Sequence, residues 1–192
     1  MFNKHALSAL ALVAAAAITP TAFAQQDEAP PLTTAALLQQ TDTDASAALE
    51  NLYAKSPETR ELIASAKGVL IVPDVRAGGA ILGAEYGRGV LHVPGTPNTY
   101  YNARTASVGA QLGFESKSVI LVFLTQNALD RFRNSKGWTV GVDGSVAFVK
   151  NGESGKFDTN TARHSIVGFV ETKEGLMFDL SLTGTHFSKA PV

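Results

Sequence analysis

The sequence predicts an α+β fold in which N-terminal helices pack on a curled, mostly antiparallel β-sheet or partly closed barrel. Between residues 34 and 66 the apolar residues recur at helical spacing, whereas after Lys67-Gly68 they alternate with period two. Several short strand-like segments then follow at nearly regular spacing, which is typical of antiparallel sheets that curl or close. Neither an internal repeat nor a second domain is visible, so residues 34–192 are expected to form one domain.

The first 33 residues are typical of an export signal and a leader. Ala6 to Ile18 is an apolar run of 13 residues, whereas a membrane-spanning helix needs about 20. Ala22-Phe23-Ala24 has the small-x-small form of a signal-peptidase site. We therefore expect residues 1–24 to be a removable signal peptide and the polar, proline-containing residues 25–33 to be a disordered leader. The mature protein is expected in the periplasm, where it could lie peripherally on an envelope membrane.

Charge and cysteine content exclude several classes of function. Removal of the signal leaves 15 basic and 17 acidic residues. No overall positive field is then available to hold nucleic acid, so any contact with phosphate or membrane must be local. The chain contains no cysteine, which excludes disulfides, thiolate catalysis and sulfur-bound metals.

Two amphipathic helices are expected before the sheet. Apolar residues of the first helix share one face: Ala45, Ala48, Leu49, Leu52 and Tyr53. Asp42 or Asp44 can cap this helix. Ser56 and Pro57 then have the residue types favoured at the N-cap and first position of a second helix, which extends to about residue 66.

The strands begin at a continuous apolar run, Val69 to Val72, which is typical of a strand covered on both faces. Pro73-Asp74 interrupts it. In the next segment, residues 80–93, several glycines share one face, and glycine inside a strand usually marks a bend or a close backbone approach. Val119 to Leu124 is a second buried run.

The C-terminal third is expected to contain one short helix between further strands. Thr125 can cap a helix that runs through Phe132. One strand face is expected to carry Trp138, Val140, Val142, Val146 and Phe148. The last strand is expected to alternate through Leu176, Phe178, Leu180 and Leu182.

No motif indicates a cofactor, a metal or a catalytic site. The histidines of the mature chain lack metal-ligand spacing, no G-x-S-x-G elbow is present, and the glycine-rich segments do not spell a nucleotide-binding loop. The protein is therefore expected not to be an enzyme. A hydrolase remains an alternative if Glu85, Asp143 and His92 meet in one concave pocket.

Six segments occur in this order: AKGVLIVP (66–73), GAEYGRGVL (83–91), SVGAQLGFESKSVILVF (107–123), ALDRF (128–132), GWTVGVDGSVA (137–147) and GLMFDLSLTGT (175–185). Together they resemble the SYLF domain family, a lipid-binding module. The resemblance spans about residues 49–187. It implies lipid binding without catalysis, since eukaryotic relatives bind phosphoinositides and some fungal ones also bind and bundle actin. Actin binding is not carried over, because an exported chain would not meet actin.

The resemblance also suggests where lipid would bind. In the family, basic and amphipathic features of the N-terminal region are associated with membrane contact, and residues 49–67 correspond to that region here. Lys55, Arg60 and Lys67 are therefore the first candidates for lipid binding, and local charge adds Arg76 and Arg88. The expected partner is an anionic phospholipid or phosphoinositide-like head group, at about 1 kcal/mol per basic residue near an anionic surface. The alternative is a periplasmic scaffold that holds an envelope protein.

Overall fold

Three α-helices surround one nine-stranded sheet in the part of the chain that the structure describes. The computed structural model describes residues 34–78, 83–107, 116–149, 164–172, 175–176 and 182–191. The predicted signal peptide and leader, and positions 177–181 of the predicted last strand, lie outside these ranges. The described residues belong to one compact unit.

Among the described residues the order is two helices, four strands, a third helix and five further strands. They are α1 (Thr34–Lys55), α2 (Thr59–Ser65), β1 (Gly68–Gly78), β2 (Gly83–His92), β3 (Thr99–Ser107), β4 (Lys117–Phe123), α3 (Gln126–Asn134), β5 (Trp138–Thr139), β6 (Ala147–Phe148), β7 (Ile166–Thr172), β8 (Gly175–Leu176) and β9 (His186–Lys189). The sheet order is β5-β9-β3-β2-β1-β4-β7-β6, with β8 beside β7. Only the β6–β7 pair is parallel among these strands. The predicted fold class is confirmed.

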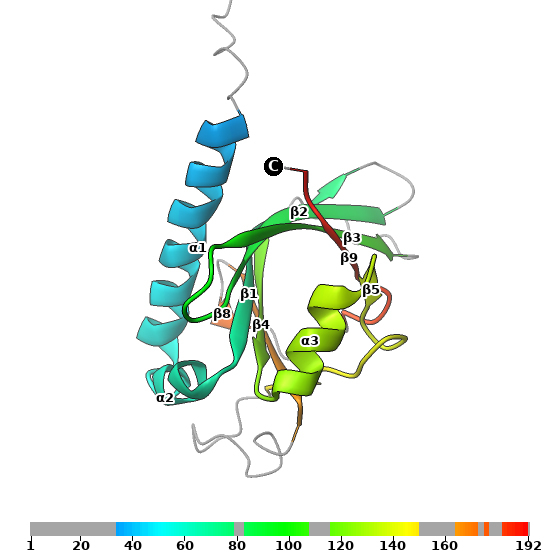
Figure 1. Cartoon of the computed structure of the whole chain (residues 1–192). Helices are drawn as coiled ribbons and strands as arrows, with labels where there is room; N and C mark the ends of the chain where they lie inside the picture. Colours follow the sequence, from blue (N-terminus) through cyan, green and yellow to red (C-terminus); the bar gives the residue numbers. More distant parts are fainter. Residues whose placement is uncertain are drawn as a thin grey trace, which may run out of the picture. The chain divides into compact units, whose positions relative to one another are not determined.

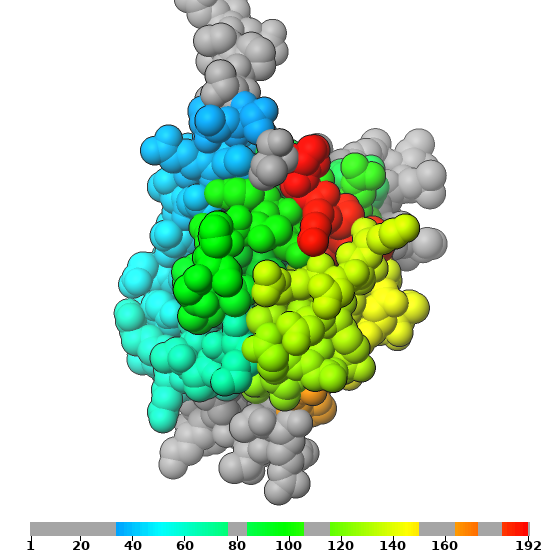
Figure 2. All heavy atoms as spheres, viewed as in Figure 1, coloured from blue at the N-terminus to red at the C-terminus, as the bar shows by residue number. Residues whose placement is uncertain are grey.

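Both faces of the central strands are covered, as their continuous apolar runs predict. In β1, Leu70 and Val72 face one hydrophobic cluster, whereas Val69 and Ile71 face another. The outer face, as we call it, carries α1 and α2, and the concave face carries α3 (Figure 1). In the space-filling view the same helices form opposite flanks of the unit (Figure 2).

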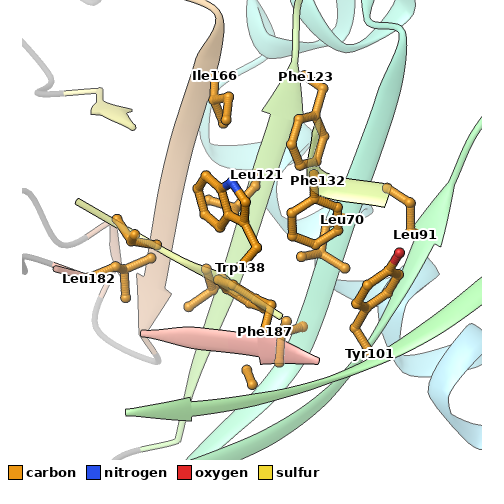
Figure 3. Packing of buried hydrophobic residues seen from close by; sticks show 14 of the residues in the cluster. Leu70, Leu91, Tyr101, Leu121, Phe123, Phe132, Trp138, Ile166, Leu182 and Phe187 are labelled. Carbon is orange, nitrogen blue, oxygen red and sulfur yellow. The ribbon is translucent and has the colours of Figure 1, made fainter. Parts of the chain in front are cut away.

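Aromatic side chains fill the concave face (Figure 3). Phe132 of α3 lies at their centre, with ring centroids 4.8 Å from Tyr101, 5.0 Å from Phe123 and 5.5 Å from Trp138. Thr125 caps α3 by accepting a hydrogen bond from the Ala128 amide, as predicted. This helix therefore carries Phe132 into the hollow that the curling strands leave open.

Pro73 does not end its strand. It lies in a β-bulge of β1, where the register shifts between Ile71 and Asp74 against β2. A bulge tolerates proline because the local ladder is already interrupted. Gly89 of β2 lies opposite, and a Cβ there would approach the Ile71 carbonyl oxygen to 2.6 Å. This close approach is the one that glycine inside the strand predicts.

The helical segment differs from expectation at two caps. Since α1 begins at Thr34, Asp42 and Asp44 lie inside it and neither is its cap. The Asp42 carboxylate instead accepts hydrogen bonds from Tyr100 Oη at 2.8 Å and Asn98 Nδ2 at 3.2 Å. Ser56 is not the N-cap of α2, because its carbonyl closes a turn with Thr59 before the helix begins.

The predicted strand through residues 138–148 is wrong. Only β5 and β6 are extended, and Val142 is 80% exposed between them. The chain turns here because Gly141 has a φ of +85° and the Asp143 carboxylate accepts a hydrogen bond from the Thr139 amide. In addition, β9 pairs with β3 and was not anticipated. No helix among the described residues is both long and apolar enough to cross a bilayer.

Candidate ligand-binding surface on the outer face

Basic side chains gather on the outer face where β1, β2 and β3 extend past α1. Register places Arg76 of β1 opposite Tyr86 of β2, and Tyr86 opposite Arg104 of β3. The next row holds Asp74, Arg88 and Asn102. These six residues share the face of Val90 and Tyr100, because side chains on a strand alternate between faces. We call them the basic strip.

The strip is accessible and has a net positive charge. Arg76, Tyr86 and Arg104 are exposed, and Arg88 and Asn102 are partly exposed. Three arginines lie beside one carboxylate, Asp74, which forms an ion pair with Arg76. Directly opposed side chains of neighbouring strands lie about 5 Å apart at Cβ. Arg76 and Arg104 are two strands apart, about 10 Å at the backbone, and Arg88 is diagonal to both. Their long side chains therefore share one patch of the outer face.

A polar groove of about 590 Å³ lies between α1 and the sheet. The helix contributes Asp44, Asn51 and Lys55 to its lining. The strands contribute Asp74 from β1, Ser118 from β4, and Glu171 and Thr172 from β7, and Ser116 precedes β4. The Ser116 hydroxyl donates to Asp74 at 2.7 Å.

Glu171 is the most deeply buried charged side chain of this groove, at 4% exposure. The Ser118 hydroxyl is 3.5 Å from Oε2, and the Lys55 ammonium is 3.5 Å from Oε1. Both contacts are long, and Oε1 accepts no hydrogen bond from the residues that the structure describes. Burial raises the pKa of this carboxyl, although Lys55 and Ser118 act in the opposite direction.

The groove and the basic strip form one continuous polar band. Glu171 lies opposite Ser118, and the β1 bulge that carries Asp74 follows on the next strand. Asp74 then lies opposite Arg88, and Arg88 opposite Asn102. The band is acidic at its groove end and basic at its strip end. A neighbouring site on the concave face carries a second ion pair, Lys117 to Glu85 at 2.8 Å.

The structure separates the five predicted lipid-binding residues. Arg76 and Arg88 lie together on the strip, whereas Lys55 lies in the groove beside Glu171. Arg60 forms an ion pair with Glu50 at 3.4 Å and lies over the Tyr53 ring at 4.2 Å. Lys67 is exposed between α2 and β1. The role of these residues in lipid binding stays a prediction.

The alternative catalytic trio does not assemble. Glu85 faces the concave side, and His92, seven residues along the same strand, contacts Asn98. Seven residues of strand span about 23 Å. Asp143 binds the Thr139 amide in the turn after β5. Within the described ranges, moreover, no three histidine, aspartate or glutamate side chains cluster as a metal site would require.

Sequence reasoning missed Tyr86, Arg104 and Glu171. Arg104 and Tyr86 alternate correctly within their strands, and that alternation was the available signal. Which strands are neighbours depends on pairing across a bulge, and this could not be read from the order of residues. Glu171 is a charged residue next to the apolar run 166–170, and its residue type gives no signal of burial, whereas it lies within the buried strand β7.

Residues 104–191 match the Ysc84 family, whose description is "Las17-binding protein actin regulator". The match is with the SYLF domain family that the sequence motifs resemble. It supports a binding domain for this segment. The match begins at Arg104 of the basic strip and includes the groove residues of β4 and β7. No curated protein matches the chain.

Proposed function

We propose that this domain binds the phosphate groups of anionic phospholipids or phosphoinositide-like head groups through the basic strip. The observation that carries the proposal is the placement of Arg76, Arg88 and Arg104 on three adjacent strands. Guanidinium groups bind phosphate oxygens in pairs of parallel hydrogen bonds. The exposed Tyr86 lies between them and suits a membrane interface, where its ring contacts apolar matter and its hydroxyl stays in water.

The test is vesicle sedimentation with residues 25–192 and a graded content of anionic lipid. Binding is expected to rise with anionic content and fall with salt. Replacing Arg76, Arg88 and Arg104 together by glutamine should remove about 3 kcal/mol of binding free energy to anionic vesicles, so the affinity should fall roughly a hundredfold. The matched control replaces Arg131, Arg133 and Lys136 by glutamine, which removes the same number of charges in and after α3, away from the strip. Unchanged binding by the strip variant would reject the proposal.

Lys55, Arg60 and Lys67 define an alternative lipid-binding location, at the helices. A variant with Lys55, Arg60 and Lys67 replaced by glutamine loses the same charge as the strip variant. We expect a smaller effect from it, because Lys55 and Arg60 already form ion pairs with Glu171 and Glu50. If this variant loses binding and the strip variant does not, head groups bind at the helices.

We also propose that the domain acts at the bacterial envelope after export. The apolar run 6–18 and the Ala22-Phe23-Ala24 site support this location. Mass spectrometry of the cellular protein should find Gln25 at the N-terminus, and fractionation should find it with the periplasm. A full-length protein in the cytoplasm would contradict the proposal. A stable co-purifying envelope protein, without lipid binding, would instead favour the scaffold function.

A further inference from the structure

The outer-face row that holds Arg76, Tyr86 and Arg104 continues onto two more strands. Register places Arg104 of β3 opposite His186 of β9, and His186 opposite Thr139 of β5. The strands β1, β2, β3, β9 and β5 are consecutive neighbours in the sheet. Since directly opposed residues of neighbouring strands share a face, His186 lies on the face of the basic strip, one strand beyond Arg104.

The His186 ring is exposed on this face and is held in place by β5. The next residue, Phe187, belongs to the concave cluster, as alternation requires. Nδ1 of His186 is 3.0 Å from the Thr139 hydroxyl oxygen, and a Cβ at Gly137 would lie 2.6 Å from Nε2. A hydroxyl donates to a neutral ring nitrogen and accepts from a protonated one. The Thr139 contact therefore persists in both charge states of the ring.

The charged groups around His186 come from three places. Arg104 lies opposite it on β3, and Lys136 lies two residues before β5, so both oppose a further positive charge. Asp143, whose carboxylate binds the β5 backbone, has the opposite effect. On β9 itself, Lys189 alternates to the other face. All four are exposed, so water and salt weaken their effects, and an anionic surface placed against the row favours the charged ring.

We propose that His186 is a fourth basic residue of this binding surface, charged at mildly acid pH, so that anionic lipid binds more tightly as the pH falls. The inference rests on the proposed function, because it extends the same surface by one strand. From Arg76 to His186 the row covers three strand spacings, about 15 Å. It therefore contacts several head groups of a membrane at once. Histidine changes its charge between about pH 5 and 8, whereas arginine does not.

The experiment measures sedimentation of residues 25–192 with vesicles at about pH 5.5 and about pH 7.5, across the range in which histidine changes its charge. The probe is phosphatidylglycerol in phosphatidylcholine. Its phosphodiester stays ionised over this range, so a change in binding reports a change in the protein. The wild type should bind about fivefold more tightly at the lower pH, as expected for one added basic charge near an anionic surface.

Two substitutions of the exposed ring fix its charge in opposite ways. His186→Gln should bind at both pH values as the wild type does at the higher one. His186→Lys should bind at both as the wild type does at the lower one. The controls are His92→Gln and His164→Gln, because all three histidines of the tested chain are exposed and only His186 lies in the row. Both controls should keep the pH dependence of the wild type.

The outcomes separate this inference from the proposed function. Wild-type binding that does not change with pH overturns the inference, as does a pH dependence that persists in His186→Gln. The second result would assign the dependence to carboxyl groups such as Glu171, whose pKa is raised by burial. In either case, weaker binding by the glutamine variant of the three strip arginines would leave the proposed function intact. Absence of any dependence on anionic lipid would reject the proposed function and this inference together.

Discussion

Glu171 is a buried carboxyl whose environment favours the protonated form. Burial raises its pKa above the ordinary value of 4.5, against the opposing effects of Lys55 and Ser118. The folded state therefore binds this proton more tightly than the unfolded chain does. The resulting stabilisation is complete below the unfolded pKa and is lost as the pH rises through the folded pKa.

We predict that the free energy of unfolding of Glu171→Gln falls less than that of the wild type as the pH rises from about 4.5, the ordinary pKa of the group. The nearby charges of Lys55, Asp44 and Asp74 are the same in both proteins. Urea denaturation at a series of pH values measures the difference. Parallel pH profiles would show that Glu171 does not titrate abnormally.

Gly89 is needed because the β1 bulge brings backbone close to β2. A Cβ at this position would lie 2.6 Å from the Ile71 carbonyl oxygen and 2.7 Å from Val72 Cγ2. Backbone cannot move aside as a side-chain end can. We predict that Gly89→Ala lowers the unfolding free energy by about 1–3 kcal/mol, the usual cost of overpacking.

Chemical denaturation of Gly89→Ala measures this cost. The control is Gly95→Asn, because Gly95 has a φ of +74° with open space around its Cβ position, and asparagine tolerates the left-handed region. It should be close to wild type. If Gly89→Ala were as stable as the wild type, the two strands could move apart at the bulge without lowering the unfolding free energy, and the prediction would be wrong.

At the scale of elements, α1 is attached to the sheet by both apolar and polar contacts. Leu52 is fully buried against the outer face, and Asp42 accepts hydrogen bonds from Tyr100 and Asn98. Burial and the hydrogen bond to Asp42 raise the pKa of Tyr100. The position of α1 also sets the width of the groove, because its flank forms one wall.

A double-mutant cycle tests this attachment. We predict a coupling of about 1.5–3 kcal/mol between Asp42→Ala and Tyr100→Phe, as expected for a hydrogen bond to a charged group. Asp44→Ala, two residues along the same helix, should be additive with Tyr100→Phe. Unfolding free energies of the single and double variants supply the coupling. A value near zero would mean that apolar burial alone holds α1.

At the scale of the whole unit, the curled sheet is held by the aromatic cluster around Phe132. This ring contacts Tyr101 of β3, Trp138 of β5 and Phe187 of β9, which are neighbouring strands at one side of the sheet. It also contacts Phe123 of β4, which lies beyond β2 and β1. A single side chain thus connects both sides of the curl (Figure 3).

We predict that Phe132→Ala destabilises the unit by about 3–5 kcal/mol, the usual cost of removing a buried phenyl ring. Phe132→Leu should cost less, because it leaves a smaller cavity. Far-ultraviolet circular dichroism and Trp138 fluorescence should report coincident unfolding of the wild type, since one core unites the described elements. A separate Trp138 transition would instead indicate that the β5–β9 edge unfolds alone.

The overall charge of the chain conceals the arrangement that matters for binding. A nearly neutral protein carries an acidic groove and a basic strip side by side across one sheet. Composition describes long-range attraction, whereas selectivity at the site depends on which charges are neighbours.

The sequence by itself determined the fold class, because periodicity reports which faces are buried. The apolar runs at 69–72 and 119–124 indicated strands with two covered faces, and Thr125 indicated the start of its helix through a local hydrogen bond. The alternation of apolar residues predicted a strand through residues 138–148 that does not exist. The alternation continues through the turn at Gly141 and Asp143, so it could not reveal that turn.

Only the tertiary structure decided which charges form the site. Arg76, Arg88 and Arg104 become neighbours through strand register, and register shifts at the Pro73 bulge. Glu171 enters the groove because β7 lies beside β4 and the flank of α1 forms the facing wall. These are long-range pairings, set by the packing of the whole core rather than by any local sequence preference.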